Sequence, residues 1–265
     1  MGQISPLMQV MSDAVRKAGR RLTRDFNEVE HLQVSKKGPA DFVSNADMKS
    51  EEILYEELAR ARPGYGFLME ERGEVEGTDK SHRWIVDPLD GTLNFLHAQP
   101  HFAISVALER EGELVAGIVY NPAIDEFFHA EKGRGAFVNE RRLRVAERRH
   151  FEDAVIGTGM PFFGRKGHAR FLKELHQIMP MAAGIRRNGS AALDLAWVAA
   201  GRLDGFWERG LKPWDIAAGM VIVREAGGYA SAIDDSTDVL DTGDIVAGNE
   251  IMIDALKDKL AKANG

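Results

Sequence analysis

Apolar residues in the first half of the chain follow two different periods. Between residues 7 and 22 they recur every three or four positions, which predicts an amphipathic helix. A second helix is expected between a Gly-Pro turn at Gly38 and a Pro-Gly pair at Pro63, because both dipeptides interrupt regular structure. From residue 65 to residue 139, apolar runs spaced by about ten residues are separated by glycine-containing and Asn-Pro turns. This part is predicted to be an antiparallel meander.

The pattern changes near residue 150, where short apolar runs begin to alternate with amphipathic segments of helical length. Such alternation is typical of layered α/β structure. No repeat, low-complexity tract or linker separates the halves, so we predict an N-terminal α+β lobe over residues 1–150 and a C-terminal α/β lobe over 151–265, sharing one compact unit. In the second lobe the predicted strands are 154–159, 203–208 and 244–249, and the predicted helices are 168–179, 190–201, 214–227 and 250–263.

Composition narrows the class of protein. The 265 residues are 44% hydrophobic and 28% charged, which is ordinary for a globular protein with an ample core. A net charge of −7 argues against binding nucleic acid or an anionic membrane through the field of the whole molecule. The absence of cysteine excludes disulfides, thiolate metal sites and cysteine nucleophiles. No apolar run reaches the ~18 residues of a membrane span, so we expect a soluble, cytoplasmic protein.

The sequence WIVDPLDGTLNF, at residues 84–95, holds two carboxylates on one tight turn. Asp87 ends an apolar strand, Pro88 fixes its own φ angle, and Gly91 permits a sharp bend that returns Asp90 toward Asp87. Two carboxylates about 4 Å apart repel by roughly 4 kcal/mol at an effective dielectric constant of 20. The turn therefore suggests a cation between them. The alternative is an Asx-turn whose aspartates only accept hydrogen bonds from nearby amides, and the turn alone leaves both interpretations open.

Further acids favour the cation. Glu70 and Glu71 follow a second apolar strand, and because side chains alternate along a strand, only one of the two is expected to face the Asp87 turn. Asp215 begins a predicted helix, where it could equally serve as the N-cap. Carboxylates without a grouping of histidine or cysteine favour Mg²⁺ over zinc.

These segments, in this order and at this separation, resemble the inositol monophosphatase family of Mg²⁺-dependent, lithium-sensitive sugar phosphatases. The resemblance runs from about Lys36 to Gly228, with one departure at Met69, where the family often has glycine before the glutamate pair. It implies an α/β sugar-phosphatase fold with alternating α-β-α-β-α layers, mixed and antiparallel sheets, and a homodimer.

The resemblance also implies a ligand set for two or three Mg²⁺ ions. Glu70, Asp87 and the carbonyl oxygen of Leu89 would hold the first ion. Asp87, Asp90 and Asp215 would hold the second, and a third, weaker ion would share Glu70 through waters. Lithium is expected to replace the second ion.

Catalytic roles follow from the same resemblance. Glu70 and Thr92 would orient the attacking water, and Thr92 would in turn bond Asp47. The substrate phosphate would lie against Leu89 and Asp90 and accept hydrogen bonds from the amides of Gly91 and Thr92.

The polyol portion of the substrate would be recognised by a loop-to-helix junction and a strand end. These residues could also be surface charges and an ordinary helix start. Lys36 matches a family position near the phosphate, although a solvated lysine is an equally good interpretation. The predicted polyol-binding residues, together with Asp215, are Arg186, Gly189, Ser190, Ala191 and Glu208.

The predicted activity is hydrolysis of myo-inositol monophosphate or a similar sugar or polyol phosphate. Relatives with the same metal site hydrolyse fructose 1,6-bisphosphate, histidinol phosphate or 3′-phosphoadenosine phosphates, and pocket loops decide among them. No P-loop motif is present, and the eight histidines form no HExxH pattern. The Gly157-Thr-Gly159 segment lacks the third glycine of a dinucleotide fingerprint.

A non-enzymatic alternative comes from a basic segment inside this acidic protein. Its arginines could dock RNA or RNA polymerase, and members of the family associate with the transcription machinery. A solvated hairpin edge is the simpler explanation, and the intact acid set makes any docking role additional to catalysis. The arginines are Arg141, Arg142, Arg144, Arg148 and Arg149.

Overall fold

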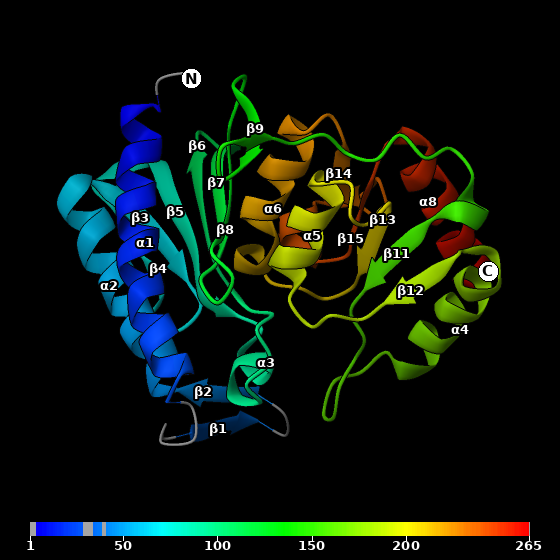
Figure 1. Cartoon of the computed structure of the whole chain (residues 1–265), viewed down its shortest axis with the longest axis horizontal. Coiled ribbons are helices and arrows are strands. Elements are labelled where there is room, and N and C mark those ends of the chain that lie inside the picture. Colours follow the sequence, from blue (N-terminus) through cyan, green and yellow to red (C-terminus); the bar gives the residue numbers. More distant parts are fainter. Residues whose placement is uncertain (1–3, 29–33, 39–40, 265) are drawn as a thin grey trace.

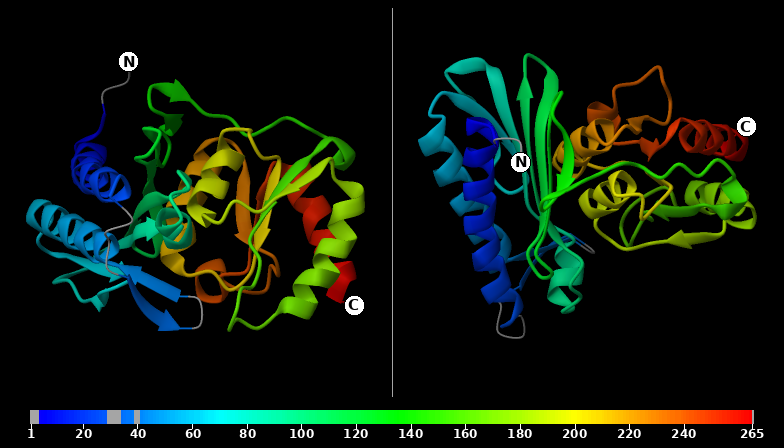
Figure 2. Two further views of the ribbon diagram at one scale, coloured as in Figure 1. Left: turned by 60° about the horizontal axis from the view of Figure 1, so that its bottom comes forward. Right: turned by 45° about the horizontal axis from the view of Figure 1, so that its top comes forward.

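The computed structural model describes residues 4–28, 34–38 and 41–264. Helices and sheets alternate in five layers, α-β-α-β-α, with an eight-stranded and a five-stranded sheet (Figure 1). The predicted fold class is confirmed. In the two further views of Figure 2, the N-terminal helices lie on one side of the large sheet and the second half of the chain lies on the other. Among the described residues, no helix is long and apolar enough to cross a membrane.

The first layer consists of two long helices that pack on each other and on the large sheet. Ser5 accepts a hydrogen bond from the amide of Met8 (3.0 Å) and caps the first helix, which buries a stripe including Met11 and Leu22. The helix predicted over residues 7–22 is present and longer at both ends. A short two-stranded ribbon, absent from the prediction, precedes the second helix; the side chain of Lys36 lies outside what the structure describes. The elements are α1 (Pro6–Phe26), β1 (Val34–Gly38), β2 (Asp41–Ser44) and α2 (Asn45–Ala61).

The eight-stranded sheet has the order β10-β9-β8-β7-β6-β5-β3-β4. From β5 onward it is the expected antiparallel meander. The prediction was wrong at its start, because β3 runs parallel to β5, with Met69 opposite Val86. The hairpin strand β4 pairs on the far side of β3, so the chain re-enters the sheet in the same direction. The strands are β3 (Tyr65–Met69), β4 (Gly73–Val75), β5 (Asp79–Asp90), β6 (Ala103–Arg110), β7 (Glu113–Asn121), β8 (Glu126–Glu131), β9 (Gly135–Val138) and β10 (Arg141–Arg142).

The parallel pairing of β3 and β5 brings their carboxyl ends to one edge of the sheet. Glu70 follows the last residue of β3, and Asp87 and Asp90 lie at the end of β5. This topology places the two acidic segments side by side.

The middle layer is formed by α5 (Ala191–Ala199) and α6 (Pro213–Glu225), which are buried almost all round. Their side chains share one core cluster with both sheets. Close packing depends on small residues: a Cβ at Gly117 of β7 would lie 2.6 Å from the carbonyl oxygen of Ala218 in α6.

The five-stranded sheet has the order β12-β11-β13-β15-β14, and α4 and α8 pack on its outer side. The strands and helices predicted for this half are present. The short elements β12, β14 and α7 were missed, as were two single turns of 3-10 helix at Phe151–Asp153 and Met179–Met181. The elements are β11 (Val155–Thr158), α4 (His168–Ile178), β12 (Gly184–Arg186), β13 (Gly205–Glu208), β14 (Tyr229–Ala232), α7 (Val239–Thr242), β15 (Ile245–Gly248) and α8 (Glu250–Asn264).

Candidate active site

Carboxylates from four separate segments converge at the carboxyl ends of β3 and β5. One oxygen from each of Asp87, Asp90 and Asp215 lies within 4.8 Å of the other two. A second group, with the same spacing, joins Glu70 and Glu71 to Asp47 of α2. The two groups touch, because Glu70 and Asp87 are hydrogen-bonded through their side chains.

Both glutamates belong to an acid group, but Glu71 is grouped with Asp47 and Glu70 rather than with the Asp87 turn. The alternation argument does not apply here. Strand β3 ends at Met69, so Glu70 and Glu71 lie in a turn rather than on the two faces of a strand. Glu70 remains the one of the pair that is bonded to Asp87.

The Asp87 turn is held by its own backbone as well as by distant groups. The amide of Leu89 donates to Asp87 Oδ1 (2.9 Å), so the turn is an Asx-turn even though Asp87 also belongs to the acid group. Gly91 has φ 89°, and a Cβ there would lie 3.0 Å from the carbonyl oxygen of His101 and 3.3 Å from that of Gly189. The chain needs glycine at this position because the loop containing Gly189 packs directly on the turn.

Helix α3 (Thr92–Leu96) begins immediately after this turn. The Thr92 hydroxyl donates to the carbonyl oxygen of Leu89 (3.0 Å), within the expected ligand segment. A hydroxyl has one proton to donate, so the expected bond from Thr92 to Asp47 would need this rotor to turn. That bond stays a prediction.

Asp90 is attached to the start of α5, about a hundred residues away in sequence. The hydroxyl of Ser190 donates to Asp90 Oδ2 (2.5 Å), and so does the amide of Ala192 (2.8 Å). Ser190 also caps α5 by accepting from the amide of Leu193 (3.3 Å). Nearby, Asn94 of α3 donates to the carbonyl oxygen of Asn188 (2.9 Å). The junction predicted to bind substrate is thus bonded to an acid of the candidate metal site, and no local sequence pattern indicates this link.

Asp215 lies one turn into α6 rather than at its N-cap. The N-cap is Lys212, and its amide donates to Asp215 Oδ2 (2.7 Å), while Pro213 occupies the first helical position. The N-cap interpretation of Asp215 is wrong, although the side chain does satisfy an amide at the start of the helix. The helix start is fixed to the large sheet through the Ser105 hydroxyl, which donates to the carbonyl oxygen of Trp214 (2.9 Å).

Burial and mutual repulsion raise the pKa values of these acids. Burial and then the charges of Asp215 and Glu71 raise the pKa of Glu70 to about 8. Burial raises the pKa of Asp215 to about 7, with Asp90 as the next cause. Burial raises the pKa of Asp90 to about 6 against the opposing bonds from Ser190 and Ala192. A buried group of carboxylates in which the charged forms are disfavoured is suited to a cation. Its oxygen-only donor set fits a hard divalent ion such as Mg²⁺.

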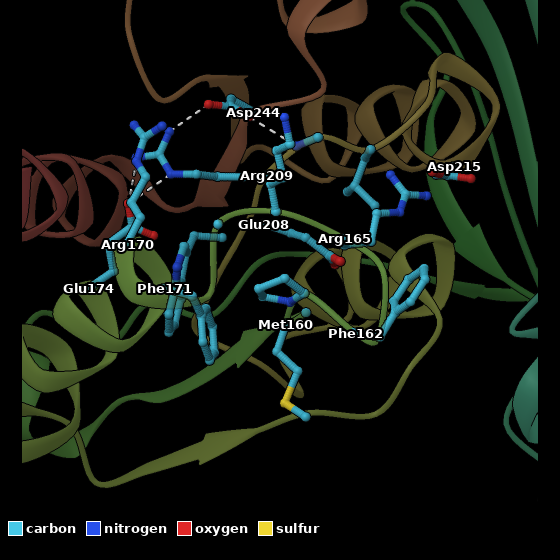
Figure 3. A pocket seen from close by; sticks show the side chains of 17 residues that line it. Met160, Phe162, Arg165, Arg170, Phe171, Glu174, Glu208, Arg209, Asp215 and Asp244 are labelled. Atoms are coloured by element: carbon cyan, nitrogen blue, oxygen red, sulfur yellow. Dashed lines mark hydrogen bonds and ion pairs between the residues drawn. The ribbon is translucent and has the colours of Figure 1, made fainter. Parts of the chain in front are cut away.

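A pocket of about 400 Å³ adjoins the acid group at Asp215 (Figure 3). Glu208, at the end of β13, projects into it, and burial followed by the charges of Asp194 and Asp215 raises its pKa. A Cβ at Gly159 would lie 1.8 Å from Glu208 Oε1, so only glycine leaves room for this carboxylate. In the Gly157-Thr-Gly159 segment, Gly159 makes this space, whereas Gly157 packs against Leu203 and Phe206.

The far wall of the pocket is an ion-pair network that sequence reasoning missed (Figure 3). Arg209 pairs with Glu174 (2.7 Å) and with Asp244 (2.6 Å), and Arg170 also pairs with Glu174 (3.2 Å). These residues are far apart in the chain, and each alone looks like a surface charge. The network anchors the segment that follows Glu208.

Arg186 is not brought to this pocket. It lies exposed at the end of β12, where its guanidinium donates to the carbonyl oxygen of Ile185 (3.0 Å). Of the predicted polyol-binding residues, Glu208 and Asp215 line the pocket, whereas Arg186, Gly189, Ser190 and Ala191 do not.

The chain matches known proteins over nearly its whole length. Residues 3–264 match the model of the inositol monophosphatase family. An inositol-1-monophosphatase of Mesorhizobium japonicum is 62% identical over 252 residues, which cover 95% of each chain. The Nus factor SuhB of Escherichia coli is 40% identical over 262 residues, 97% of this chain and 98% of that protein.

The fold is also similar to solved structures. The crystal structure of extragenic suppressor protein suhB from Bartonella henselae has a TM-score of 0.94 and 56% identity, covering 97% of this chain and 99% of that one. Sequence, fold and the arrangement of acids agree: this chain belongs to the inositol monophosphatase family.

Proposed function

We propose that this protein is a Mg²⁺-dependent phosphomonoesterase whose main substrate is myo-inositol monophosphate. The observation that carries the proposal is the approach of Asp87, Asp90 and Asp215 to within 4.8 Å beside a pocket of about 400 Å³. A group of buried acids is a binding site for cations, and cations are needed to bring a phosphate dianion there. The name of the Mesorhizobium japonicum relative supports the choice of substrate.

The ligand set follows the sequence prediction. Glu70, Asp87 and the Leu89 carbonyl oxygen would hold one Mg²⁺, and Asp87, Asp90 and Asp215 would hold another. A third, weaker ion that shares Glu70 through waters is also part of the proposal. When bound, the ions lower the pKa of a water and neutralise charge on the phosphate.

The protein's own groups orient the reactants. Glu70 and the Thr92 hydroxyl orient the attacking water, and Glu70 accepts its proton as the oxygen attacks phosphorus in line. The amides of Gly91 and Thr92 donate to the phosphate oxygens, and Asp47 supports Thr92. The P–O bond to the alcohol breaks, and the leaving alkoxide takes up a proton from solvent.

The polyol is held at the far side of the phosphate. Glu208 accepts hydrogen bonds from two neighbouring hydroxyls in the pocket. The junction at Gly189, Ser190 and Ala191 does not line this pocket, and its assignment to substrate rests on the family resemblance and on the bond from Ser190 to Asp90. The assignment of Arg186 to substrate rests on the family resemblance alone, since its side chain lies outside the pocket.

A panel of phosphate esters tests the proposal. With Mg²⁺ present, we expect kcat/KM for myo-inositol 1-phosphate to exceed the values for fructose 1,6-bisphosphate, histidinol phosphate and 3′-phosphoadenosine 5′-phosphate. Excess chelator should abolish turnover of all four. Preference for another ester would keep the chemistry and change the substrate, while full activity in chelator would contradict the chemistry.

A second role in transcription is supported by the 40% identity to a protein named Nus factor SuhB. One of the five arginines is already engaged within the protein, because Arg148 forms an ion pair with the buried carboxylate of Asp204 (3.0 Å). The surface available for docking is therefore smaller than the sequence indicated. Arg141, Arg142, Arg144 and Arg149 remain exposed. RNA polymerase or RNA retained by the protein at low salt, and lost in an Arg141→Glu/Arg144→Glu variant that keeps phosphatase activity, would support this role.

We also propose a cytoplasmic homodimer, as the family resemblance implies. Exposed apolar side chains on and near α4, including Phe163, Leu172 and Met179, offer a surface for self-association. Sedimentation that finds only monomer at micromolar concentration would contradict the dimer.

A further inference from the structure

Three neighbouring polar residues on α2 are buried. Asp47, Ser50 and Glu51 recur at the three- and four-residue spacing of one helix face, and each is less than 5% exposed. The same face continues into the apolar core through Leu54 and Leu58. Buried polar side chains need partners, and the partners here lie in the two segments that carry the acids.

Ser50 holds the first of these segments. Its hydroxyl donates to the carbonyl oxygen of Pro88 (2.9 Å), in the middle of the Asp87–Asp90 turn. Ser50 is fully buried, so this bond is shielded from water. It fixes the turn relative to α2.

Glu51 holds the second segment. Its Oε2 accepts from the amide of Glu71 (2.8 Å), and the amide of Arg72 also bonds this carboxylate. Both amides follow Glu70 directly. On the solvent side, the Arg72 guanidinium pairs with Glu52 and lies over the ring of Tyr55 (4.1 Å), so the segment is attached to α2 at several points.

The two attachments lie on successive residues of one helix and hold segments whose side chains repel. Glu70 and the Asp87–Asp90 turn lie at neighbouring strand ends, and the charges of Asp90, Asp215 and Glu71 repel that of Glu70, which tends to separate these ends when no cation balances them. Ser50 and Glu51 fix both backbones to the helix and so oppose that separation, and neither residue belongs to the acid groups. Such outer supports commonly change metal affinity by ~10–100-fold.

We propose that Ser50 and Glu51 are positioning residues that set the spacing between Glu70 and the Asp87–Asp90 turn and thereby the affinity for Mg²⁺. The inference rests on the proposed function, because it concerns the same acids. It assigns no catalytic contact to either residue.

Substitutions at Glu51 test this directly. Glu51→Leu removes the acceptor at similar size, and Glu51→Gln retains one acceptor oxygen. Glu56→Leu, on the exposed side of the same helix, is the matched control. By calorimetry we expect Glu51→Leu to weaken Mg²⁺ binding at least ~10-fold. Glu51→Gln should recover most of the affinity, and Glu56→Leu should match the unsubstituted protein.

Two further readouts separate positioning from a general loss of stability. In Mg²⁺-free protein, hydrogen exchange of the amides of Glu71 and Arg72 should accelerate in Glu51→Leu while exchange in the core of α2 is unchanged. In activity assays, the Mg²⁺ concentration for half-maximal rate should rise, while kcat at saturating Mg²⁺ should recover toward the original value. If Glu51→Leu fails to fold, Ser50→Ala and Glu51→Gln provide the same comparison with smaller effects.

Unchanged Mg²⁺ affinity in folded Glu51→Leu, or in both milder variants, would overturn the inference and leave the proposed function intact. An unsubstituted protein that hydrolyses none of the phosphate esters would overturn the proposed function instead. In that case the hydrogen-exchange comparison still decides whether Glu51 holds the segment after Glu70.

Discussion

At the scale of single residues, the two adjacent glutamates after β3 have different surroundings. Glu70 is bonded to Asp87, whereas the amide of Glu71 donates to Glu51 and the Glu71 carboxylate belongs to the group with Asp47 and Glu70. We expect Glu70→Gln to lower kcat by ~10²–10⁴-fold, as is typical for loss of a positioned acid–base group, and Glu71→Gln to lower it much less. Measuring kcat for both at saturating Mg²⁺ decides between them. Equal losses, or a larger one at Glu71, would reverse the assignment.

Gly159 is a second residue whose role depends on one neighbour. A methyl group there would overlap the Glu208 carboxylate and force it out of its position. Gly159→Ala should therefore lower kcat/KM for inositol phosphate at least ~10-fold, as should Glu208→Gln, because the site would lose its bonds to the polyol. Turnover of p-nitrophenyl phosphate, which has no polyol, should change little. A parallel fall for both substrates would place the damage at the metal site instead.

Asp194 gives a prediction about pH and stability. It is buried in α5, accepts a bond from Asn188 (2.6 Å), and burial raises its pKa from 3.8 to about 7. A folded-state pKa above the unfolded value means that the unfolded state releases its proton first, so stability falls as pH rises from about 4 to about 7. The loss is about 4 kcal/mol at most, at 1.36 kcal/mol per pKa unit.

The Asp194→Asn variant keeps the acceptor oxygen and removes the titration. Its free energy of unfolding, relative to that of the unsubstituted protein, should therefore increase between pH 5 and pH 8. Urea denaturation at the two pH values measures this difference. A constant difference would show that Asp194 is ionised in the folded protein throughout.

At the scale of elements, the sequence predicts helices and strands whose apolar residues recur periodically, but it does not predict which strands pair with each other. The long helices and the meander strands were predicted because their apolar residues repeat over many positions. Strands β12 and β14 were missed because their sequences, Gly-Ile-Arg and Tyr-Ala-Ser-Ala, contain no apolar run, unlike the equally short strands β11, β13 and β15. The parallel pairing of β3 with β5 could not be predicted either. It depends on β4, a three-residue strand that pairs with β3 on the side away from β5, and this placement leaves no pattern in the sequence.

The acids of the site were predictable for a different reason. Asp87 and Asp90 lie within one short motif, and the end of a strand is a position that sequence can indicate. The bond from Ser190 to Asp90 joins residues one hundred positions apart, and no local pattern encodes it. The same holds for the pairing of Arg209 with Glu174 and Asp244.

The Asp87 turn and the start of α6 together form an acid group, from which we predict how the phosphatase activity depends on Mg²⁺ and Li⁺. Asp87, Asp90 and Asp215 form a compact acid group, so we expect activity to require Mg²⁺. From the family resemblance we also expect millimolar Li⁺ to inhibit it by replacing the ion held there. Asp215→Asn should weaken both Mg²⁺ activation and Li⁺ inhibition. Rates measured against each ion test this. Indifference to Li⁺ alone would question the closeness of the family resemblance rather than the metal mechanism.

At the scale of the whole molecule, the core determines whether the lobes can fold apart. One buried cluster contains Val119 and Phe128 of the large sheet together with Leu195 of α5, Ile222 of α6 and Ala247 of the small sheet. A break near residue 150 would expose the face of the large sheet that α6 covers, and burial is worth about 25 cal/mol per Å² of apolar surface.

We therefore expect a fragment of residues 1–150 to lack a cooperative thermal transition, although its helices and meander are local. The acid group would also be incomplete in this fragment, because Asp215 and Ser190, which donates to Asp90, both lie after residue 150. Mixing fragments 1–150 and 151–265 should restore a cooperative transition and, with it, Mg²⁺ binding. Calorimetry of each fragment and of the mixture makes the comparison. A fragment 1–150 that melts cooperatively by itself would show that the large sheet does not need α5 and α6, and that the chain has two folding units rather than one.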